Sequence, residues 1–182
     1  LEKIRQGKRI RIVGDYDIDG VCSTYLLYKG LKRLGAAVDY EIPDRIKDGY
    51  GINIQIVEAA AEDNIDTILT CDNGISAIDQ MKRARELGMT VIVTDHHDIV
   101  KVGEEDVLPE ADAIVNPKQS ADTYPWKEIC GGMVAYKLIQ ILYEKAGIDR
   151  EEWLAMIEFA AIATVGDVMK LQDENRIVVK EG

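Results

Sequence analysis

Short, β-branched apolar segments alternate along the chain with longer stretches in which apolar residues recur every three or four positions. The short segments predict β-strands, and they comprise residues 9–13, 38–42, 67–70, 91–94 and 113–115. The periodic stretches predict amphipathic helices, and they comprise residues 21–34, 54–62 and 77–87. Gly35 and Gly88 directly follow two of these stretches, at the position where a glycine commonly ends a helix.

Strands that alternate with helices over short links indicate right-handed crossovers and a parallel sheet. We therefore predict an α/β fold with a parallel five-stranded doubly wound sheet and helices on both faces. After Pro125 only the helical period continues, and Asp149 is the expected N-cap of a helix. We expect one domain over residues 1–182, with the sheet core in 1–125. The helical part, 126–182, would lead towards a second domain of a longer protein.

The composition adds charge to this picture, since the 182 residues carry a net charge of −11 at pH 7. No apolar run approaches the roughly 20 residues of a membrane span, so we expect a soluble, cytoplasmic protein without membrane partners. Cys22, Cys71 and Cys130 lack the spacing of a zinc site or a disulfide framework, and we expect them to be reduced and buried. The acidic balance argues against a phosphate-backbone binder, unless carboxylates converge on divalent cations that offset their repulsion.

An acidic motif, Asp15-Tyr16-Asp17-Ile18-Asp19-Gly20, directly follows the first predicted strand. In an open α/β sheet, ligands bind at the carboxyl ends of the strands. A calcium EF-hand loop begins similarly but needs a glutamate at its twelfth position, which is Leu26 here. The motif also resembles the nucleophile motif of dehalogenase-type phosphatases, with Asp17 as nucleophile, and a solvated acidic turn is the structural alternative.

Two further polar clusters follow predicted strands. Asp72-Asn73-Gly74 comes after residues 67–70, and by itself it is also ordinary turn chemistry. Asp95-His96-His97 comes after residues 91–94 and holds the only two histidines of the chain. Imidazole is the common nitrogen ligand of transition metals, and carboxylate partners orient it. Mixed carboxylate and imidazole ligands suit manganese, iron or zinc better than calcium.

The helical part contributes two more candidates. Asp167 ends the apolar helix 159–166, where a charge is costly to bury unless it is paired or bound to a metal. The alternative is a helix-end carboxylate that faces water. Gly131-Gly132 precedes the helix 133–142, where backbone amides can bind a phosphate, although a plain loop is the more common explanation of such a pair.

With these residues the chain resembles the DHH phosphoesterase superfamily, named for the tripeptide found here at 95–97. Its other motifs are similar to residues 14–20, 72–76 and 165–168. Residues 43–45, 48–51, 115–117 and 130–132 are most similar to a bacterial branch of single-strand-specific 5′-to-3′ exonucleases that act in DNA repair and recombination. Pyrophosphatases and short-oligonucleotide hydrolases of the superfamily carry a histidine where this chain has Val13.

This resemblance implies an enzyme, a phosphodiester hydrolase with two Mn²⁺ ions, or Mg²⁺ in their place, that acts on single-stranded DNA. The implied metal ligands are Asp17, Asp19, Asp72, His96 and Asp167, with Asp72 between the ions and Asp15 as an auxiliary ligand. The implied catalytic residues are Asp72, His96 and His97, and the implied phosphate contacts are Arg45 and His97. Asp95 and Asn73 would support the ligands from behind. Without the second domain, the chain would be weakly active or inactive.

Several alternatives remain at this point. A receiver-type signalling domain would use Asp15, Asp17, Asp72 and Lys118, and it predicts no role for His96. A dehalogenase-type phosphatase would use a single magnesium ion. Other members of the DHH superfamily act on short oligonucleotides or cyclic dinucleotides. A non-catalytic scaffold of the superfamily would have lost motif residues, and none of the main ones is missing here.

Overall fold

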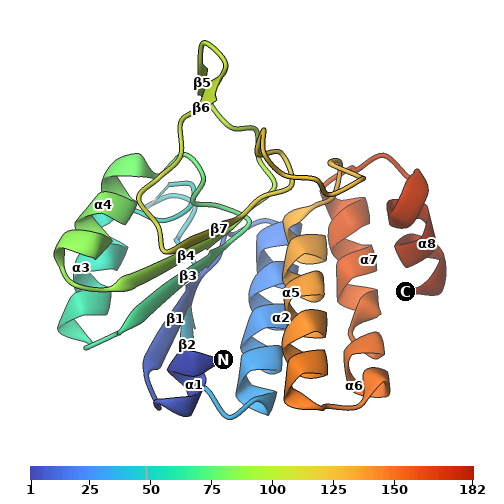
Figure 1. The fold of residues 1–182 in the computed structure, drawn as a ribbon, viewed down its shortest axis with the longest axis horizontal. Helices are drawn as coiled ribbons and strands as arrows, with labels where there is room; N and C mark the ends of the chain where they lie inside the picture. The colour runs from blue at the N-terminus through green and yellow to red at the C-terminus, as the bar shows by residue number, and fades with distance from the viewer. Residues whose placement is uncertain (48) are drawn as a thin grey trace.

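A parallel five-stranded sheet with helices on both faces forms the centre of the molecule, as the sequence predicts (Figure 1). The computed structural model describes residues 1–47 and 49–182, so Asp48 of the motif 48–51 lies outside the described residues. The strand order is β2-β1-β3-β4-β7. The strands are β1 (Arg9–Val13), β2 (Ala37–Glu41), β3 (Thr67–Cys71), β4 (Thr90–Thr94) and β7 (Ala113–Val115), each within one residue of the predicted bounds.

The helices divide between the two faces of the sheet. One face carries α3 (Ile54–Glu62) and α4 (Ile78–Glu86), and the other carries α2 (Ile18–Arg33) and α5 (Gly131–Ala146) (Figure 1). Outside α2 and α5 lie the C-terminal helices α6 (Arg150–Leu154), α7 (Ile157–Gly166) and α8 (Asp173–Glu181). The doubly wound fold followed by a helical part is therefore confirmed.

Two apolar cores hold these layers together. Ile68, Val57 and Met81 belong to the core under α3 and α4. Ile12 and Met133 belong to the other core, which joins β1 to α2, α5 and α7. The helical part thus shares a core with the sheet instead of forming one of its own. Such buried apolar contacts are the main favourable term in folding, and they hold the ends of α5 and α7 against the sheet.

Capping side chains set several helix boundaries. Asp17 caps α2, since its carboxylate accepts a hydrogen bond from the amide of Gly20 at 2.8 Å. Helix α2 therefore begins at Ile18, three residues before its predicted start at residue 21. Asp149 caps α6 as predicted, and its carboxylate accepts a hydrogen bond from Glu151.

The shortest elements were not predicted. They are the helix α1 (Glu2–Arg5) and the hairpin of β5 (Lys101–Val102) and β6 (Glu105–Asp106). Segments of two to four residues contain too few positions to show a period. The three cysteines are free and buried, as predicted. Among the described residues, no helix combines the length and the apolar character needed to cross a bilayer.

The topology defines where a ligand would bind. Strand β2 lies on one side of β1 and β3 lies on the other, so the direction of winding reverses between β1 and β3. In open α/β sheets the crevice at the carboxyl ends of the strands beside such a switch point is the usual ligand site. The acidic motif 15–19 follows β1 and Asp72 follows β3, so both lie at this crevice.

Candidate metal centre

Four side chains from separate segments meet at the carboxyl end of the sheet. Asp19 lies in the first turn of α2, Asp72 follows β3, and His96 follows β4. Asp167 is the C-cap residue of α7 and reaches the site from the helical layer. The packing of α7 against α2 therefore completes a cluster that begins at the sheet.

The imidazole of His96 is at the centre of this cluster. Its Nε2 atom lies 3.1 Å from Oδ1 of Asp72, 3.5 Å from Oδ2 of Asp19 and 3.6 Å from Oδ2 of Asp167. Two sets of ligand atoms each fall within 4.8 Å of one another, namely Asp72, His96 and His97, and Asp19, His96 and Asp167. Ligand atoms bound at about 2.1 Å to an octahedral cation are themselves about 3 Å apart, so these spacings are near those of a metal shell.

Several buried atoms of the cluster lack hydrogen bonds. Oδ1 of Asp72 and both ring nitrogens of His96 have no hydrogen-bond partner in the described part of the chain. Nearly all buried polar groups in proteins are hydrogen-bonded, so such atoms indicate a missing ion or water. The nitrogen and oxygen donors present fit manganese or another divalent transition metal better than calcium.

The electrostatics of the cluster also favour a cation. Burial, followed by the charges of Asp19 and Asp17, raises the pKa of Asp72. Burial raises the pKa of Asp167 as well, against the opposing attraction of His96. Burial lowers the pKa of His96 and outweighs the attraction of Asp19. His96 is therefore neutral at pH 7 with a lone pair for a metal, and a bound cation would stabilise the ionised carboxylates.

The carboxylate of Asp19 is oriented by the N-terminus of α5. Its Oδ2 atom accepts a hydrogen bond from the amide of Gly131 and its Oδ1 atom from the amide of Gly132, both at 2.7 Å. The sequence left this glycine pair open between a phosphate site and a plain loop. In the structure these amides bind the protein's own carboxylate. A Cβ atom at Gly131 would lie 2.7 Å from Cβ of Asp72, so only glycine allows this approach.

The structure places the other two acids of the first motif differently. Asp17 belongs to neither ligand set and caps α2, and its charge contributes to the raised pKa of Asp72. Asp15 is buried, and its Oδ1 atom accepts a hydrogen bond from the amide of Gly51 at 3.2 Å. Its other oxygen has no partner among the described residues. The ligand roles of Asp15 and Asp17 remain predictions.

Asp95 organises the loop that follows β4. Its Oδ1 atom accepts hydrogen bonds from the amides of His96 and His97 and from Nδ1 of His97, the last at 2.7 Å. Its Oδ2 atom accepts a hydrogen bond from the amide of Ile75 at 2.9 Å. Burial alone would raise the pKa of Asp95, but the hydrogen bonds, led by that from His97, lower it overall. Asp95 therefore holds both histidines in place and remains ionised.

Asn73 joins the ends of two strands to the loop before α3. Its side-chain amide donates hydrogen bonds to the carbonyl oxygens of Val13 at 3.0 Å and Cys71 at 2.9 Å. Its Oδ1 atom accepts a hydrogen bond from the amide of Ile52 at 3.2 Å. Asn73 therefore ties these strand ends to the loop before α3, and its role in supporting metal ligands remains a prediction.

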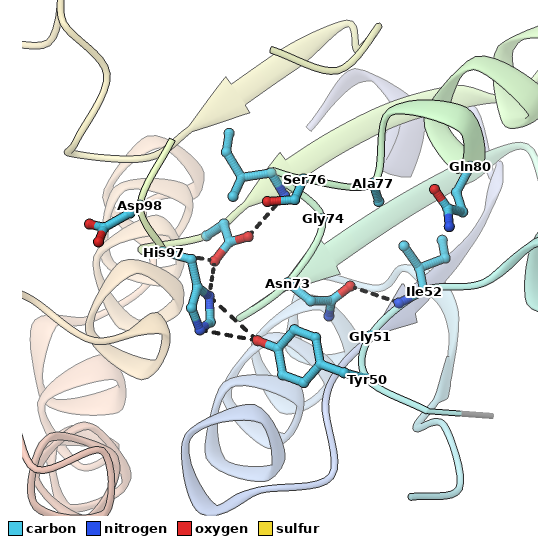
Figure 2. Close-up of a pocket in the computed structure, with 12 residues that line it drawn as sticks. Tyr50, Gly51, Ile52, Asn73, Gly74, Ser76, Ala77, Gln80, His97 and Asp98 are labelled. Carbon is cyan, nitrogen blue, oxygen red and sulfur yellow. Dashed lines mark hydrogen bonds and ion pairs between the residues drawn. The ribbon is translucent and has the colours of Figure 1, made fainter. Parts of the chain in front are cut away.

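A pocket of about 500 Å³ opens beside the cluster, and two of its lining residues, His97 and Tyr50, point towards each other and are in contact (Figure 2). The phenol of Tyr50 donates a hydrogen bond to the carbonyl oxygen of Asp72 at 2.9 Å and lies 3.1 Å from Nε2 of His97. The hydrogen bond to Asp95 raises the pKa of His97. Tyr50 belongs to the motif 48–51, but sequence reasoning gave it no role, because an exposed tyrosine in a loop carries no local signal of this contact.

Two predicted cations lie near the site without entering either ligand set. The guanidinium of Arg45 is exposed and lies 5.4 Å from the ring centre of Tyr16. Its phosphate contact remains a prediction. The ammonium of Lys118 pairs with Asp98 at 2.9 Å, and the receiver-type alternative that needs Lys118 leaves the central position of His96 unexplained.

Known proteins with this architecture were identified by sequence and by structure. The single-stranded-DNA-specific exonuclease RecJ of Bacillus subtilis is 43% identical over 181 residues, which is 100% of this chain and 22% of that protein. A crystal structure of exonuclease RecJ bound to manganese matches with a TM-score of 0.87 and 39% identity, over 100% of this chain and 44% of that one. RecJ from Thermus thermophilus in complex with Mn²⁺ matches with a TM-score of 0.79 and 36% identity, over 100% and 25% of the two chains.

The chain spans between 22% and 33% of the length of the curated RecJ exonucleases that it matches. The model of the DHH family, N-terminal domain, matches residues 9–166. That match begins with the first residue of β1 and ends with the last residue of α7. Because it takes in the whole sheet and every strand end that supplies the candidate site, the chain belongs to the DHH family.

Proposed function

We propose that this chain is the metal-binding core of a manganese-dependent exonuclease that degrades single-stranded DNA from its 5′ end, in DNA repair and recombination. One observation carries the proposal, the approach of His96 to within 3.6 Å of three carboxylates. The similarity to RecJ supports both the substrate and the metal, since relatives of known structure hold Mn²⁺ and, in another crystal, Mg²⁺. A cytoplasmic location is part of the same proposal.

Five side chains would hold two ions, with Asp72 shared between them: Asp17, Asp19, Asp72, His96 and Asp167. Asp15 would assist as an auxiliary ligand. Such ions, when bound, act as Lewis acids that stabilise the attacking and leaving oxygens of a phosphodiester. Asp72 suits the shared position because it is buried, lies close to His96 and has a free oxygen.

The remaining residues would position the substrate and the ligands. His97 faces the pocket, and Asp95 fixes its ring, so its imidazole can donate a hydrogen bond to the scissile phosphate. Its raised pKa favours the protonated donor form. Arg45 would offset the charge of a neighbouring phosphate. Asp95 and Asn73 hold the strand ends without touching the substrate.

We also propose that residues 126–182 lead towards a second domain that closes over the strand and supplies basic contacts. The net charge of −11 supports this division, because this part of the protein offers little positive surface to a phosphate backbone. Alone, the chain would hydrolyse DNA weakly or not at all. Activity tests therefore require the full-length protein.

The test uses the full-length protein with Mn²⁺ and single-stranded DNA labelled at either end. We expect the 5′ label to be released first as a mononucleotide, and Asp72→Asn to abolish this release. Lys82→Gln, on the opposite face of the sheet, is the matched control and should leave the rate unchanged. Earlier release of the 3′ label would reverse the polarity. Hydrolysis confined to short oligonucleotides or cyclic dinucleotides would favour another DHH-type phosphoesterase.

A further inference from the structure

A second groove lies at the edge of the sheet, outside the candidate metal centre. Its lining residues come from α2, from the edge strand β2 and from the residue after β2. Its volume is about 280 Å³. Six side chains line it: Val21, Thr24, Tyr25, Tyr28, Tyr40 and Ile42. None of them belongs to the motifs of the metal centre, and the proposed chemistry does not use this groove.

Three tyrosine rings make the lining of the groove aromatic. Tyr28 and Tyr40 meet edge to face, with ring centres 5.2 Å apart and planes at 76°. Tyr25 packs on Phe159 at 4.4 Å. Tyr40 is 52% exposed and Tyr25 is 37% exposed, although both rings are held by these contacts. The groove therefore offers fixed aromatic faces to a planar ligand from solution.

Two lysines cover the same rings. The ammonium of Lys29 lies 5.3 Å from the ring centre of Tyr25 and donates a hydrogen bond to its hydroxyl oxygen at 2.9 Å. The ammonium of Lys32 lies 5.5 Å from the ring centre of Tyr28. Throughout residues 1–47 and 49–182, neither lysine is within ion-pair distance of a carboxylate. In a chain with a net charge of −11, such unpaired cations over aromatic rings are suited to an anionic ligand.

The groove also has acidic neighbours. Asp39 on β2 is held by the guanidinium of Arg11 at 2.9 Å and lies 3.6 Å from that of Arg9. Glu41, at the end of β2, is exposed and forms no ion pair with a residue of the described ranges. Two exposed carboxylates, Asp17 and Glu41, therefore stand against Lys29 and Lys32 at this edge, and Asp17 is also a predicted metal ligand.

The groove is also aligned with the metal centre. Val21, Tyr25, Tyr28 and Lys32 follow the N-cap residue Asp17 at the spacings of one helix face, whereas Asp19, two residues before Val21, lies on the opposite side of α2. At a rise of about 1.5 Å per residue, Tyr28 lies about 14 Å along the helix from Asp19. A strand with its terminal nucleotide at the metal centre can therefore continue along this face of α2.

We propose that the groove binds the bases and phosphates of single-stranded nucleic acid on the 3′ side of the nucleotide at the metal centre. The proposal rests on the proposed nuclease function and extends it. Stacking on tyrosine is open to every base, and Lys29 and Lys32 offset the charge of the backbone, so binding is independent of sequence. A duplex does not fit, because its bases are already stacked on one another.

The test measures the affinity of the full-length protein for fluorescent oligothymidylates by anisotropy, in chelator so that no hydrolysis occurs. Tyr40→Ala should weaken binding of a long oligonucleotide about tenfold and leave a trinucleotide unaffected. Tyr40→Phe keeps the ring and should bind like the wild type. Lys32→Gln should also weaken binding and reduce the slope of log affinity against log salt by about one. Lys82→Gln, on α4, is the matched charge control.

Three outcomes would overturn the groove proposal. The first is that Tyr40→Ala and Lys32→Gln both bind the long oligonucleotide with the affinity of the wild type. An equal loss for the trinucleotide is the second, because it would indicate a general disturbance. The third is a loss of thermal stability in Tyr40→Ala with no change in DNA affinity, since another segment of the protein would then fill the groove. These outcomes differ from a failure of the proposed nuclease function, which would appear as an absence of Mn²⁺-dependent hydrolysis by the wild type itself.

Discussion

Nε2 of His96 lies 3.1 Å from Oδ1 of Asp72, and both atoms are buried without a hydrogen-bond partner among the described residues. The two side chains follow neighbouring parallel strands, β3 and β4, so the sheet itself holds them at this distance. A cation between them would use both free lone pairs. The pair is therefore the structural basis of the metal site that we propose, and the first two predictions concern it.

Removal of either member of this pair should impair manganese binding. We expect calorimetry to give two Mn²⁺ ions per wild-type molecule. Asp72→Asn and His96→Gln should each lose at least one ion or weaken the remaining affinity by at least about 100-fold. Asp66→Asn, at the other end of β3 and paired with Lys3, is the matched control. Wild-type stoichiometry and affinity in both site variants would refute the shared site.

Without metal, Asp72 should make the protein less stable as the pH rises. Its pKa is raised in the folded state, so the unfolded chain loses this proton first and the contribution of Asp72 to stability declines towards the folded pKa. Asp72→Asn cannot ionise. In chelator its stability relative to the wild type should rise by about 1.4 kcal/mol per pH unit between about pH 5 and about pH 8. Urea unfolding at several pH values tests this expectation, and parallel curves for the two proteins would contradict it.

Asp95 should matter for stability more than an ordinary surface acid. Its two oxygens accept hydrogen bonds from three backbone amides and from His97, and an asparagine would present an NH₂ group to some of these donors. We expect Asp95→Asn to lower the free energy of unfolding by at least about 2 kcal/mol. Glu104→Gln, in the exposed hairpin, should change it little. Equal effects of the two substitutions on denaturant unfolding would show that the network carries no special weight.

Gly131 should be required for the geometry of the metal centre. A methyl group there would lie 2.7 Å from both Cβ and Oδ1 of Asp72, so Gly131→Ala must displace that carboxylate. We expect Mn²⁺ affinity to fall at least about tenfold, with a loss of stability of about 1–3 kcal/mol. Gly35→Ala is the control. It meets open space but has a φ of +81°, so it should cost stability without changing metal affinity. Unchanged affinity in Gly131→Ala would contradict the argument.

Local sequence was sufficient for the five strands, the major helices and the fold class. Each depends on a hydrophobic period that a short window contains, and the alternation of the two periods limits the topology to a doubly wound sheet. It also showed which strand ends carry acids and histidines. It did not show α1 or the β5–β6 hairpin, because elements this short do not display a period.

The direction in which each site residue points depended on the tertiary structure. Asp19 and Asp95 both accept hydrogen bonds from backbone amides, yet only Asp19 lies near Nε2 of His96, whereas Asp95 binds Nδ1 of His97. Likewise, only the packing of α5 brings Gly131 to the carboxylate of Asp19. Hydrophobic patterns record whether a residue is buried. The distance between two side chains far apart in the chain instead depends on strand order and on the packing of helices across the sheet, which local patterns do not encode.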